Sequence, residues 1–170
     1  MGLPIDAINN RSETDFVELL GEIFEHSPWV PQLVYPLRPF TDRDALHRAM
    51  AAAVRQAPEL QRMALLCSHP ELAGKEAAAG SLTDASRREQ AGAGLDQCSA
   101  AELQRIKALN QAYRDKFEFP FIIAVSGLDK LQIIAAMERR LANRREDEFA
   151  TALGEVEKIA HIRLAAMIDG

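Results

Sequence analysis

The sequence predicts an all-α fold, a single-domain helical bundle, on the basis of three observations. Helix-favouring residues (Ala, Leu, Glu, Gln and Arg) dominate the 170-residue chain, whereas aromatic residues make up only 6%. Apolar residues recur at helical spacing in most segments. Only one apolar run, Phe119–Val125, has extended character, because Pro120 excludes it from the middle of a helix. We therefore expect one domain over residues 1–170, with this extended segment threaded through the bundle.

Caps and prolines divide the first half of the chain into three expected helices. A capping-box-like start at Ser12 begins a helix that should end near Pro28. Pro28 and three prolines within residues 29–40 make this stretch a folded connection with one short helical turn. A second helix is expected to begin with Thr41 and end before Pro58. A third, shorter helix should run from about Glu59 to Leu66.

The second half begins with a stretch in which helical periodicity lapses. Residues 68–85 are expected to form a long loop with helical fragments, and regularity returns over residues 86–91. The pattern Ser99-x-x-Glu102 is a capping box that begins a helix reaching about Phe117. Two further helices are expected, at about residues 129–140 and 146–168.

The distribution of charge argues against nucleic acid as a partner. The formal net charge is −5, whereas proteins that bind nucleic acid usually carry a basic surplus on one face. The best basic clusters are Arg139-Arg140 and Arg144-Arg145, and three acidic residues follow at 146–148. We interpret this region as a solvated helix end.

The chain carries no sign of a membrane or secreted protein. No apolar run approaches the roughly 20 residues that span a bilayer, and the N-terminus lacks the pattern of a signal peptide. Cys67 and Cys98 are too few and too far apart for a disulfide framework or a CxxC motif. We expect Cys67 to be a small buried thiol. These features together predict a cytoplasmic protein.

Arg163 is the first position that stands out chemically. The last expected helix has an apolar stripe, and Arg163 falls near its middle, seven positions after Val156. A guanidinium keeps its charge, so a buried one needs an anionic partner. Two interpretations stay open, an internal ion pair with an Asp or Glu and a binding position for a substrate carboxylate.

A second polar cluster comprises Ser86, Glu89 and Gln90. If Ser86 begins a helix, its hydroxyl caps that helix while Glu89 and Gln90 lie within one turn of it. The pattern is either a simple capping box or part of a binding site. Gly92 and Gly94 follow, and they either end the helix or let a ligand approach the backbone closely.

His69 precedes Pro70 in the irregular loop, where a lone histidine by itself indicates little. The other histidines form no metal-binding pattern, and no HExxH motif occurs. The chain also lacks GxGxxG, GxxxxGK[ST] and GxSxG elements. Metal hydrolase, dinucleotide-binding, nucleotide-phosphate-binding and serine-hydrolase functions therefore lose their usual markers.

Six segments in register resemble the 2-oxo-4-hydroxy-4-carboxy-5-ureidoimidazoline (OHCU) decarboxylase family, which carries out the last of three steps from urate to allantoin. They are Phe24–Val30 (FEHSPWV), Arg38–Phe40 (RPF), His69–Gly74 (HPELAG), Ser86–Leu95 (SRREQAGAGL), Leu109–Ile123 and Ile159–Leu164 (IAHIRL). The resemblance covers the chain from about Phe16 to Leu164. It departs from the usual pattern at Glu118, where glycine is usual, at Glu71, where aspartate is usual, and at Pro31-Gln32.

The resemblance implies an all-helical homodimer that acts without a metal ion or organic cofactor. It places the catalytic histidine at His69, and we hypothesise that Glu89 and Arg163 share the catalytic work. The implied substrate-binding residues are Pro70, Ser86, Arg87, Arg88, Glu89, Gln90, Phe121, Ile122, Ile123, Ala124, Val125 and Arg163. Two alternatives remain, a helical interaction module that has lost catalysis and a decarboxylase of a related heterocyclic acid.

Overall fold

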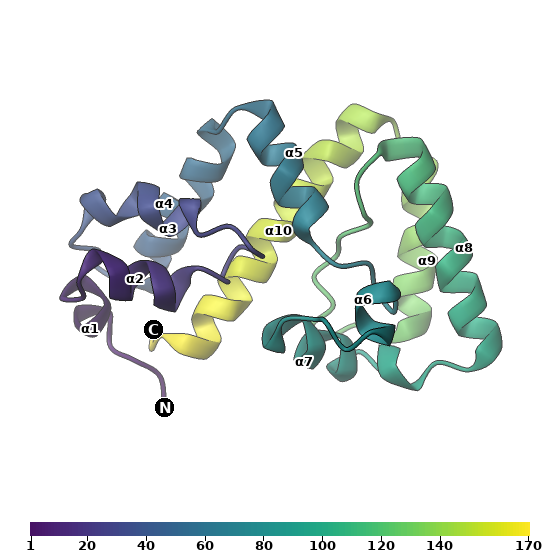
Figure 1. The fold of residues 1–170 in the computed structure, drawn as a ribbon, viewed down its shortest axis with the longest axis horizontal. Helices are drawn as coiled ribbons and strands as arrows, with labels where there is room; N and C mark the ends of the chain where they lie inside the picture. Colours follow the sequence, from purple (N-terminus) through teal and green to yellow (C-terminus); the bar gives the residue numbers. More distant parts are fainter. The chain divides into compact units, whose positions relative to one another are not determined.

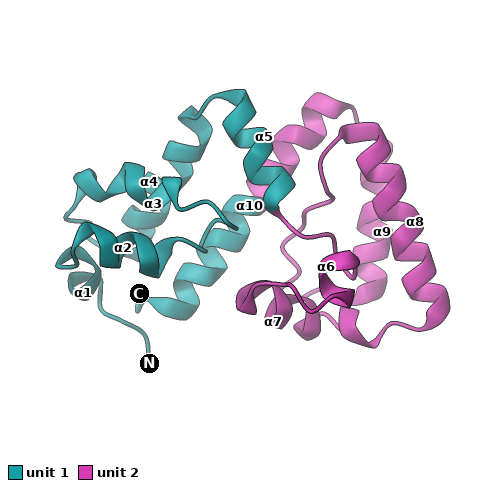
Figure 2. Ribbon diagram, in the orientation of Figure 1, with its two compact units in different colours: residues 1–68, 156–170 teal, residues 69–155 magenta.

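The computed structural model describes residues 1–170 and confirms the all-α prediction (Figure 1). It contains ten α-helices and two 3₁₀ helices, and its only β-type pairing is an isolated bridge between Leu3 and Ile168. The chain divides into two compact units, Met1–Ser68 with Val156–Gly170, and His69–Glu155 (Figure 2). The organisation of residues 1–170 as one domain stays a prediction. None of the helices combines the length and the apolar character needed to cross a bilayer.

Unit 1 contains the N-terminal helices and the end of the last helix. Its elements are α1 (Ile5–Asn9), α2 (Glu13–Leu20), α3 (Trp29–Val34), η1 (Tyr35–Leu37), α4 (Arg43–Gln56), α5 (Glu59–Ser68) and residues 156–167 of α10 (Arg145–Met167). The segments near the two termini are hydrogen-bonded to each other: Leu3 N–H donates to Met167 O and Asp169 N–H donates to Leu3 O, each at 2.9 Å.

The helix boundaries in unit 1 follow local capping, with three differences from the sequence expectation. Ser12 caps α2 as expected, but α2 ends at Leu20, well before Pro28. Asp42, not Thr41, caps α4 by accepting the N–H of Ala45 at 2.7 Å. Residues 29–40 are more helical than expected, because a proline in the first turn needs no intrahelical donor and α3 tolerates Pro31 there.

Unit 2 contains the remaining helices. They are α6 (Lys75–Ala78), α7 (Asp84–Gly92), η2 (Leu95–Gln97), α8 (Ala100–Phe117), α9 (Lys130–Arg140) and residues 145–155 of α10. The capping box of Ser99 and Glu102 is present at the start of α8. Ser86 does not cap α7, which was one of the two alternatives for this residue, because Thr83 is the cap and its hydroxyl accepts the N–H of Ser86 at 3.2 Å.

An aromatic cluster forms the core of unit 2. The Tyr113 ring lies 4.5 Å from Phe117, 5.8 Å from Phe119 and 5.3 Å from Phe121, measured between centroids. The segment Phe119–Val125 lies outside every helix, as the proline predicted. It leaves α8 through Glu118, which adopts a left-handed conformation with φ of 66°. That conformation is where a glycine is least strained, so Glu118 occupies a position at which a side chain is costly.

Two expectations about exposure are wrong. Arg140 and Glu148 are buried, with 6% and 0% of their surface exposed, rather than part of a solvated helix end. Their burial is tolerated because the two side chains form an ion pair with each other. Cys67 is exposed rather than buried, since α5 buries Leu65 and Leu66 and turns the next position outward.

Candidate active site

His69 directly follows α5 and lies in a loop whose backbone is held by long side chains. The residue itself is buried, with 7% of its surface exposed. Three successive positions after Pro70 are held in place. The Glu71 carboxylate accepts from Arg114 Nε at 2.8 Å, Leu72 O accepts from Asn110 Nδ2 at 3.0 Å, and Ala73 N–H donates to Gln90 Oε1 at 2.9 Å. The loop carrying His69 is therefore supported from α7 and α8.

Helix α7 presents Ser86, Glu89 and Gln90 on one face, at positions i, i+3 and i+4. Ser86 and Gln90 are buried, and Glu89 is half-buried. Arg87 and Arg88 lie on the exposed face, where Arg87 pairs with Asp84. The structure thus separates the side chains of the two arginines from the polar face that sequence and resemblance had grouped with them.

The Gln90 amide is already bound to the His69 loop. Its Oε1 accepts from the Ala73 N–H at 2.9 Å, and its Nε2 lies 3.5 Å from Glu71 O, the outer limit of a hydrogen bond. The geometry gives Gln90 a supporting role for the loop, which the sequence did not predict.

The segment Phe121–Val125 carries a row of backbone donors with no partner in the protein. None of its five N–H groups donates a hydrogen bond to another protein atom. Only two of its carbonyls accept one, Ile122 O from Arg140 Nη1 at 2.7 Å and Val125 O from Leu128 N–H at 3.0 Å. Buried backbone donors normally find a partner. This segment is therefore suited to bind a ligand or ordered water through its main chain.

Arg163, in unit 1, is buried on the apolar face of α10 as its spacing predicted, with 8% of its surface exposed. Its Nη1 donates to Glu25 Oε2 at 2.8 Å and to Glu22 O at 2.9 Å. The internal ion pair, one of the two interpretations of Arg163, is thus present. Sequence reasoning did not single out Glu25, although a charged residue directly after the apolar Ile23-Phe24 pair was the available signal.

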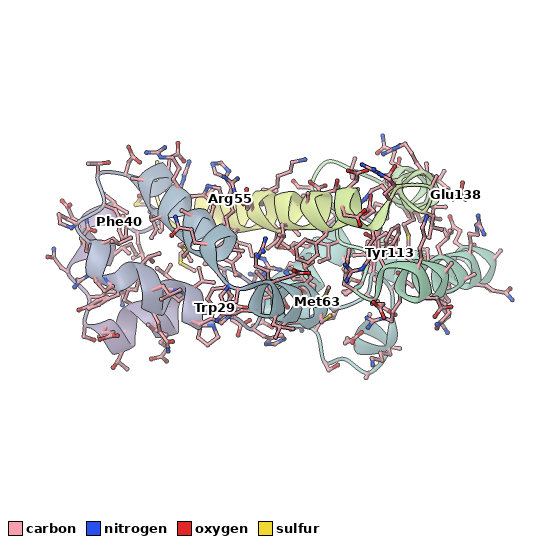
Figure 3. All side chains as sticks on the ribbon, turned by 90° about the horizontal axis from the view of Figure 1, so that it is seen from above. Trp29, Phe40, Arg55, Met63, Tyr113 and Glu138 are labelled. Carbon is pink, nitrogen blue, oxygen red and sulfur yellow. The ribbon has the colours of Figure 1, made fainter.

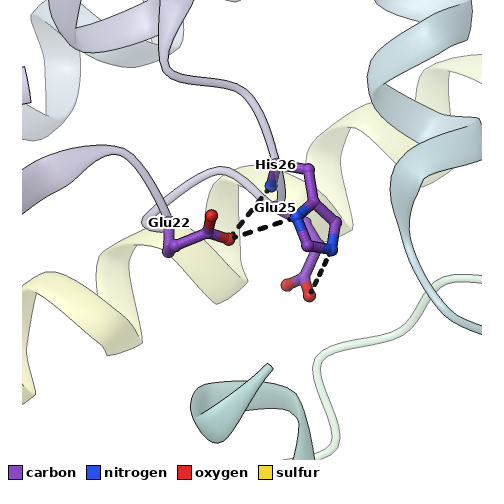
Figure 4. A group of neighbouring side chains, drawn as sticks. All are labelled: Glu22, Glu25 and His26. Atoms are coloured by element: carbon purple, nitrogen blue, oxygen red, sulfur yellow. Dashed lines mark hydrogen bonds and ion pairs between the residues drawn. The ribbon is translucent and has the colours of Figure 1, made fainter. Parts of the chain in front are cut away.

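Glu25 also belongs to a small cluster with Glu22 and His26 (Figure 4). His26 Nδ1 lies 3.7 Å from Glu22 Oε2, and His26 Nε2 lies 3.9 Å from Glu25 Oε1. The three offer ligand atoms within 4.8 Å of one another, of types that zinc accepts. A cation here would share the Glu25 carboxylate with the positive charge of Arg163, which opposes its binding. We assign no metal to this cluster, and the expectation of a metal-free protein stays a prediction.

A second buried ion pair lies beneath the Phe121–Val125 segment. Arg140 Nη2 lies 2.9 Å from Glu148 Oε2, the Tyr113 hydroxyl donates to the same oxygen at 2.5 Å, and the Arg140 guanidinium stacks over the Phe121 ring at 4.4 Å. Burial by itself raises the pKa of the Glu148 carboxyl, but hydrogen bonds from Arg140, Tyr113 and Asn143 outweigh it and lower that pKa. Burial, together with the bond to Glu148, raises the pKa of Tyr113 well above its usual value. This pair stays charged and anchors Ile122 and Phe121.

A hollow of about 760 Å³ lies on unit 2, bordered by α6, η2 and α8. It is lined by Glu71, Ala73 and Gly74 of the loop, and by Lys75 and Lys107. None of the predicted catalytic or substrate-binding residues lines it. The hollow is therefore distinct from the residues that sequence reasoning selected.

Comparison with known sequences gives one consistent result. Residues 9–165 match the family model for OHCU decarboxylase. A 2-oxo-4-hydroxy-4-carboxy-5-ureidoimidazoline decarboxylase of Haloferax volcanii is 42% identical over 163 residues, which cover 96% of this chain and 95% of the relative. A putative decarboxylase of the same name from Homo sapiens is 36% identical, over 98% of this chain and 96% of the relative.

Solved structures agree with the sequence comparison. The crystal structure of an (S)-allantoin synthase aligns with a TM-score of 0.78 and 33% identity over 98% of this chain. The alignment spans 55% of that longer chain. The crystal structure of an OHCU decarboxylase in the presence of (S)-allantoin aligns with a TM-score of 0.66 and 25% identity, over 81% of this chain and 89% of the other.

Proposed function

The chain belongs to the OHCU decarboxylase family, and from this premise we propose that it converts OHCU to (S)-allantoin and CO₂ in urate degradation. The observation that carries the proposal is the full-length match to curated decarboxylases, at 42% identity for the Haloferax volcanii protein. The matched region, residues 9–165, includes His69, Glu89 and Arg163. Membership of this family makes the chain a carboxy-lyase.

The chemistry of the substrate explains why no electron sink is required from the protein. OHCU carries a carboxylate and a hydroxyl on one ring carbon, beside a ring C=N bond. When the C–CO₂ bond breaks, its electron pair forms a C=C bond within the ring and displaces the C=N pair onto nitrogen, which takes up a proton. The resulting enol then becomes the carbonyl of allantoin as its hydroxyl proton is lost and the neighbouring carbon gains one. The enzyme has to orient the carboxylate, stabilise the developing charge and protonate one face of that carbon.

His69 is proposed as the general acid and base of the reaction. An imidazole titrates near neutral pH, so it can exchange protons with the substrate hydroxyl or the product carbon. The loop that carries it is supported at Glu71, Leu72 and Ala73, which favours a fixed position for the ring. Glu89 is proposed to orient or charge the imidazole, or to accept the hydroxyl proton itself.

The remaining roles concern binding. Ser86 and Gln90 are proposed to hydrogen-bond the ureido arm or the ring, with Gln90 also supporting the loop. Pro70 and residues 121–125 complete the proposed contacts, and the undonated N–H groups of Phe121–Val125 support main-chain recognition of the ring amides and carbonyls. For Arg87 and Arg88, whose side chains are exposed, the proposed substrate contact rests on the family resemblance alone.

Arg163 is proposed to hold an anionic or carbonyl group of the substrate. Its Nη1 is occupied by Glu25 and Glu22. A guanidinium has five N–H donors, so an ion pair at one nitrogen is compatible with a second acceptor at another. The internal ion pair and the substrate role are therefore not exclusive.

We also propose that the protein acts as a cytoplasmic homodimer without a cofactor, as the family resemblance implies. Sedimentation analysis of the purified protein tests the dimer.

The activity is tested by circular dichroism during urate breakdown by urate oxidase and hydroxyisourate hydrolase. Adding the protein should speed the appearance of optically active allantoin, because uncatalysed decay gives a racemic product. His69→Ala should abolish this gain, whereas His161→Ala, which removes an exposed imidazole paired with Asp44 at 3.4 Å, should keep it. No gain in rate or optical activity with the wild-type protein would refute the assignment.

The same purified protein distinguishes two alternative functions from OHCU decarboxylation. An interaction module of this fold would bind a protein or a purine-derived ligand, detected by calorimetry, without any turnover of OHCU. A decarboxylase of a related heterocyclic acid would release CO₂ from that acid faster than from OHCU in a substrate panel.

A further inference from the structure

We propose that Glu25 is a positioning residue for the decarboxylation, one that fixes the guanidinium of Arg163 in the orientation used with substrate. The inference rests on the proposed function, because it assigns Glu25 a purpose through the proposed role of Arg163. Glu25 is entirely buried, with 0% of its surface exposed. A carboxylate that remains in such a position needs strong compensating contacts.

The contacts of Arg163 Nη1 show how the guanidinium is held. This nitrogen carries two N–H groups, and it has two acceptors, Glu25 Oε2 at 2.8 Å and Glu22 O at 2.9 Å. Because the guanidinium is planar, fixing both hydrogens of one terminal nitrogen defines the plane and direction of the whole group. The directions of its other N–H bonds are then also defined.

The main chain of Glu25 makes a second connection. Its carbonyl accepts from Ser27 Oγ at 2.9 Å and from Ser68 Oγ at 2.8 Å. Ser68 ends α5 and is bonded directly to His69. Glu25 thus holds Arg163 with its carboxylate and, with its carbonyl, the residue that precedes the proposed acid and base.

The two connections can be separated by substitution. Glu25→Gln retains the carbonyl link to Ser68 and nearly the same side-chain shape, but it replaces a charged acceptor by a neutral one. Charge-assisted hydrogen bonds are roughly twice as strong as neutral ones. Arg163 would then be free to turn toward other acceptors. Misorientation of a binding group lowers the rate of the chemical step more than it lowers binding.

The experiment is a double-mutant cycle on turnover with Glu25→Gln, Arg163→Met and the double variant. We expect Glu25→Gln to lower kcat at least about tenfold with a smaller change in KM. In the Arg163→Met background the same substitution should cost less than about twofold, because a residue that acts through Arg163 has no effect once Arg163 is gone. Glu25→Asp, which keeps the charge but shortens the reach, should restore part of kcat.

Glu157→Gln is the matched control for a general loss of stability. Like Arg163, Glu157 lies on α10 in unit 1. Like Glu25, it pairs with an arginine, since its carboxylate accepts from Arg55 Nε at 2.6 Å. Glu157 forms its hydrogen bonds with Arg55 and His47, not with Glu25 or Arg163. We therefore expect Glu157→Gln to leave kcat within about twofold of wild type. A role of Glu25 in stability alone would lower kcat equally in both Arg163 backgrounds, and this outcome overturns the proposal. So does a Glu25→Gln variant with wild-type kcat.

A readout independent of activity is the side-chain Nε–H signal of Arg163 in ¹H–¹⁵N NMR, assigned by its loss in Arg163→Met. A protected, resolved signal is expected in the wild-type protein, and faster exchange or broadening in Glu25→Gln. If the wild-type protein shows no turnover of OHCU, the proposed function fails. The NMR result then decides the positioning by itself, and an unchanged signal in Glu25→Gln overturns it.

Discussion

Replacing Tyr113 by Phe tests the buried network of unit 2 with little change in shape. Tyr113, labelled in Figure 3, lies on α8. Its hydroxyl donates to Glu148 Oε2 at 2.5 Å, and its ring is fully buried against Phe117 and Phe121. Phe keeps these ring contacts, so no cavity forms and only the hydrogen bond is lost. A hydrogen bond to a charged group contributes about 1.5–3 kcal/mol.

The expected loss lies toward the lower end of that range. Arg140 Nε and Nη2 continue to contact Glu148 Oε2, at 3.0 and 2.9 Å, so the carboxylate oxygen is not left without a partner. We therefore expect Tyr113→Phe to lower the free energy of unfolding by about 2 kcal/mol. Urea denaturation at pH 7 measures this as a fall in the midpoint with an unchanged m-value.

Tyr35, the other tyrosine of the chain, provides a control. The Tyr35 hydroxyl lies 3.5 Å from Arg11 O and is only partly buried, so Tyr35→Phe should cost less than about 0.5 kcal/mol. If Tyr113→Phe costs no more than Tyr35→Phe, the buried hydrogen bond does not stabilise the fold and the reasoning is refuted.

Three further predictions concern stability. The pKa of Glu148 is lowered in the folded state, so its contribution to stability is complete above the unfolded pKa of about 4.3 and is lost as pH falls below it. Glu148→Gln should therefore flatten the dependence of the unfolding free energy on pH below about pH 4.3, and an unchanged slope would contradict this. Glu118→Gly should raise the free energy of unfolding by about 0.5–1 kcal/mol, because glycine adopts a φ of 66° without strain. The urea midpoint should rise accordingly, and a lower midpoint would refute the strain. Ser99→Ala should lower the thermal midpoint by the equivalent of about 1 kcal/mol through loss of the α8 cap, whereas no shift would show that the cap contributes nothing.

Features that depend on a few neighbouring residues could be predicted from the sequence. The capping box at Ser99, the break in helix at Pro120 and the burial of Arg163 on its stripe all follow from local spacing, and the structure confirms them. Local spacing failed where two signals lay close together. Thr83 and Ser86 both have a hydroxyl that can cap a helix, and which of them caps α7 depends on the path of the preceding loop.

The motif order along the chain identified the family, because six segments in register are far more specific than any one of them. The roles of His69, Glu89 and Ser86 in the reaction stay predictions. Gln90 shows the limit of carrying a role over from resemblance, since its amide supports the loop at Ala73 as well.

The sequence alone determined the helical fold, most helix boundaries, the family and the fact that Arg163 is buried. Only the tertiary structure identified the acid that balances Arg163, because Glu25 lies 138 positions away and no local pattern links them. It also decided that Arg140 and Glu148 leave solvent together with Tyr113. A buried charge is tolerated only where a partner with matching geometry meets it, and that meeting is a property of packing rather than of any short stretch of sequence.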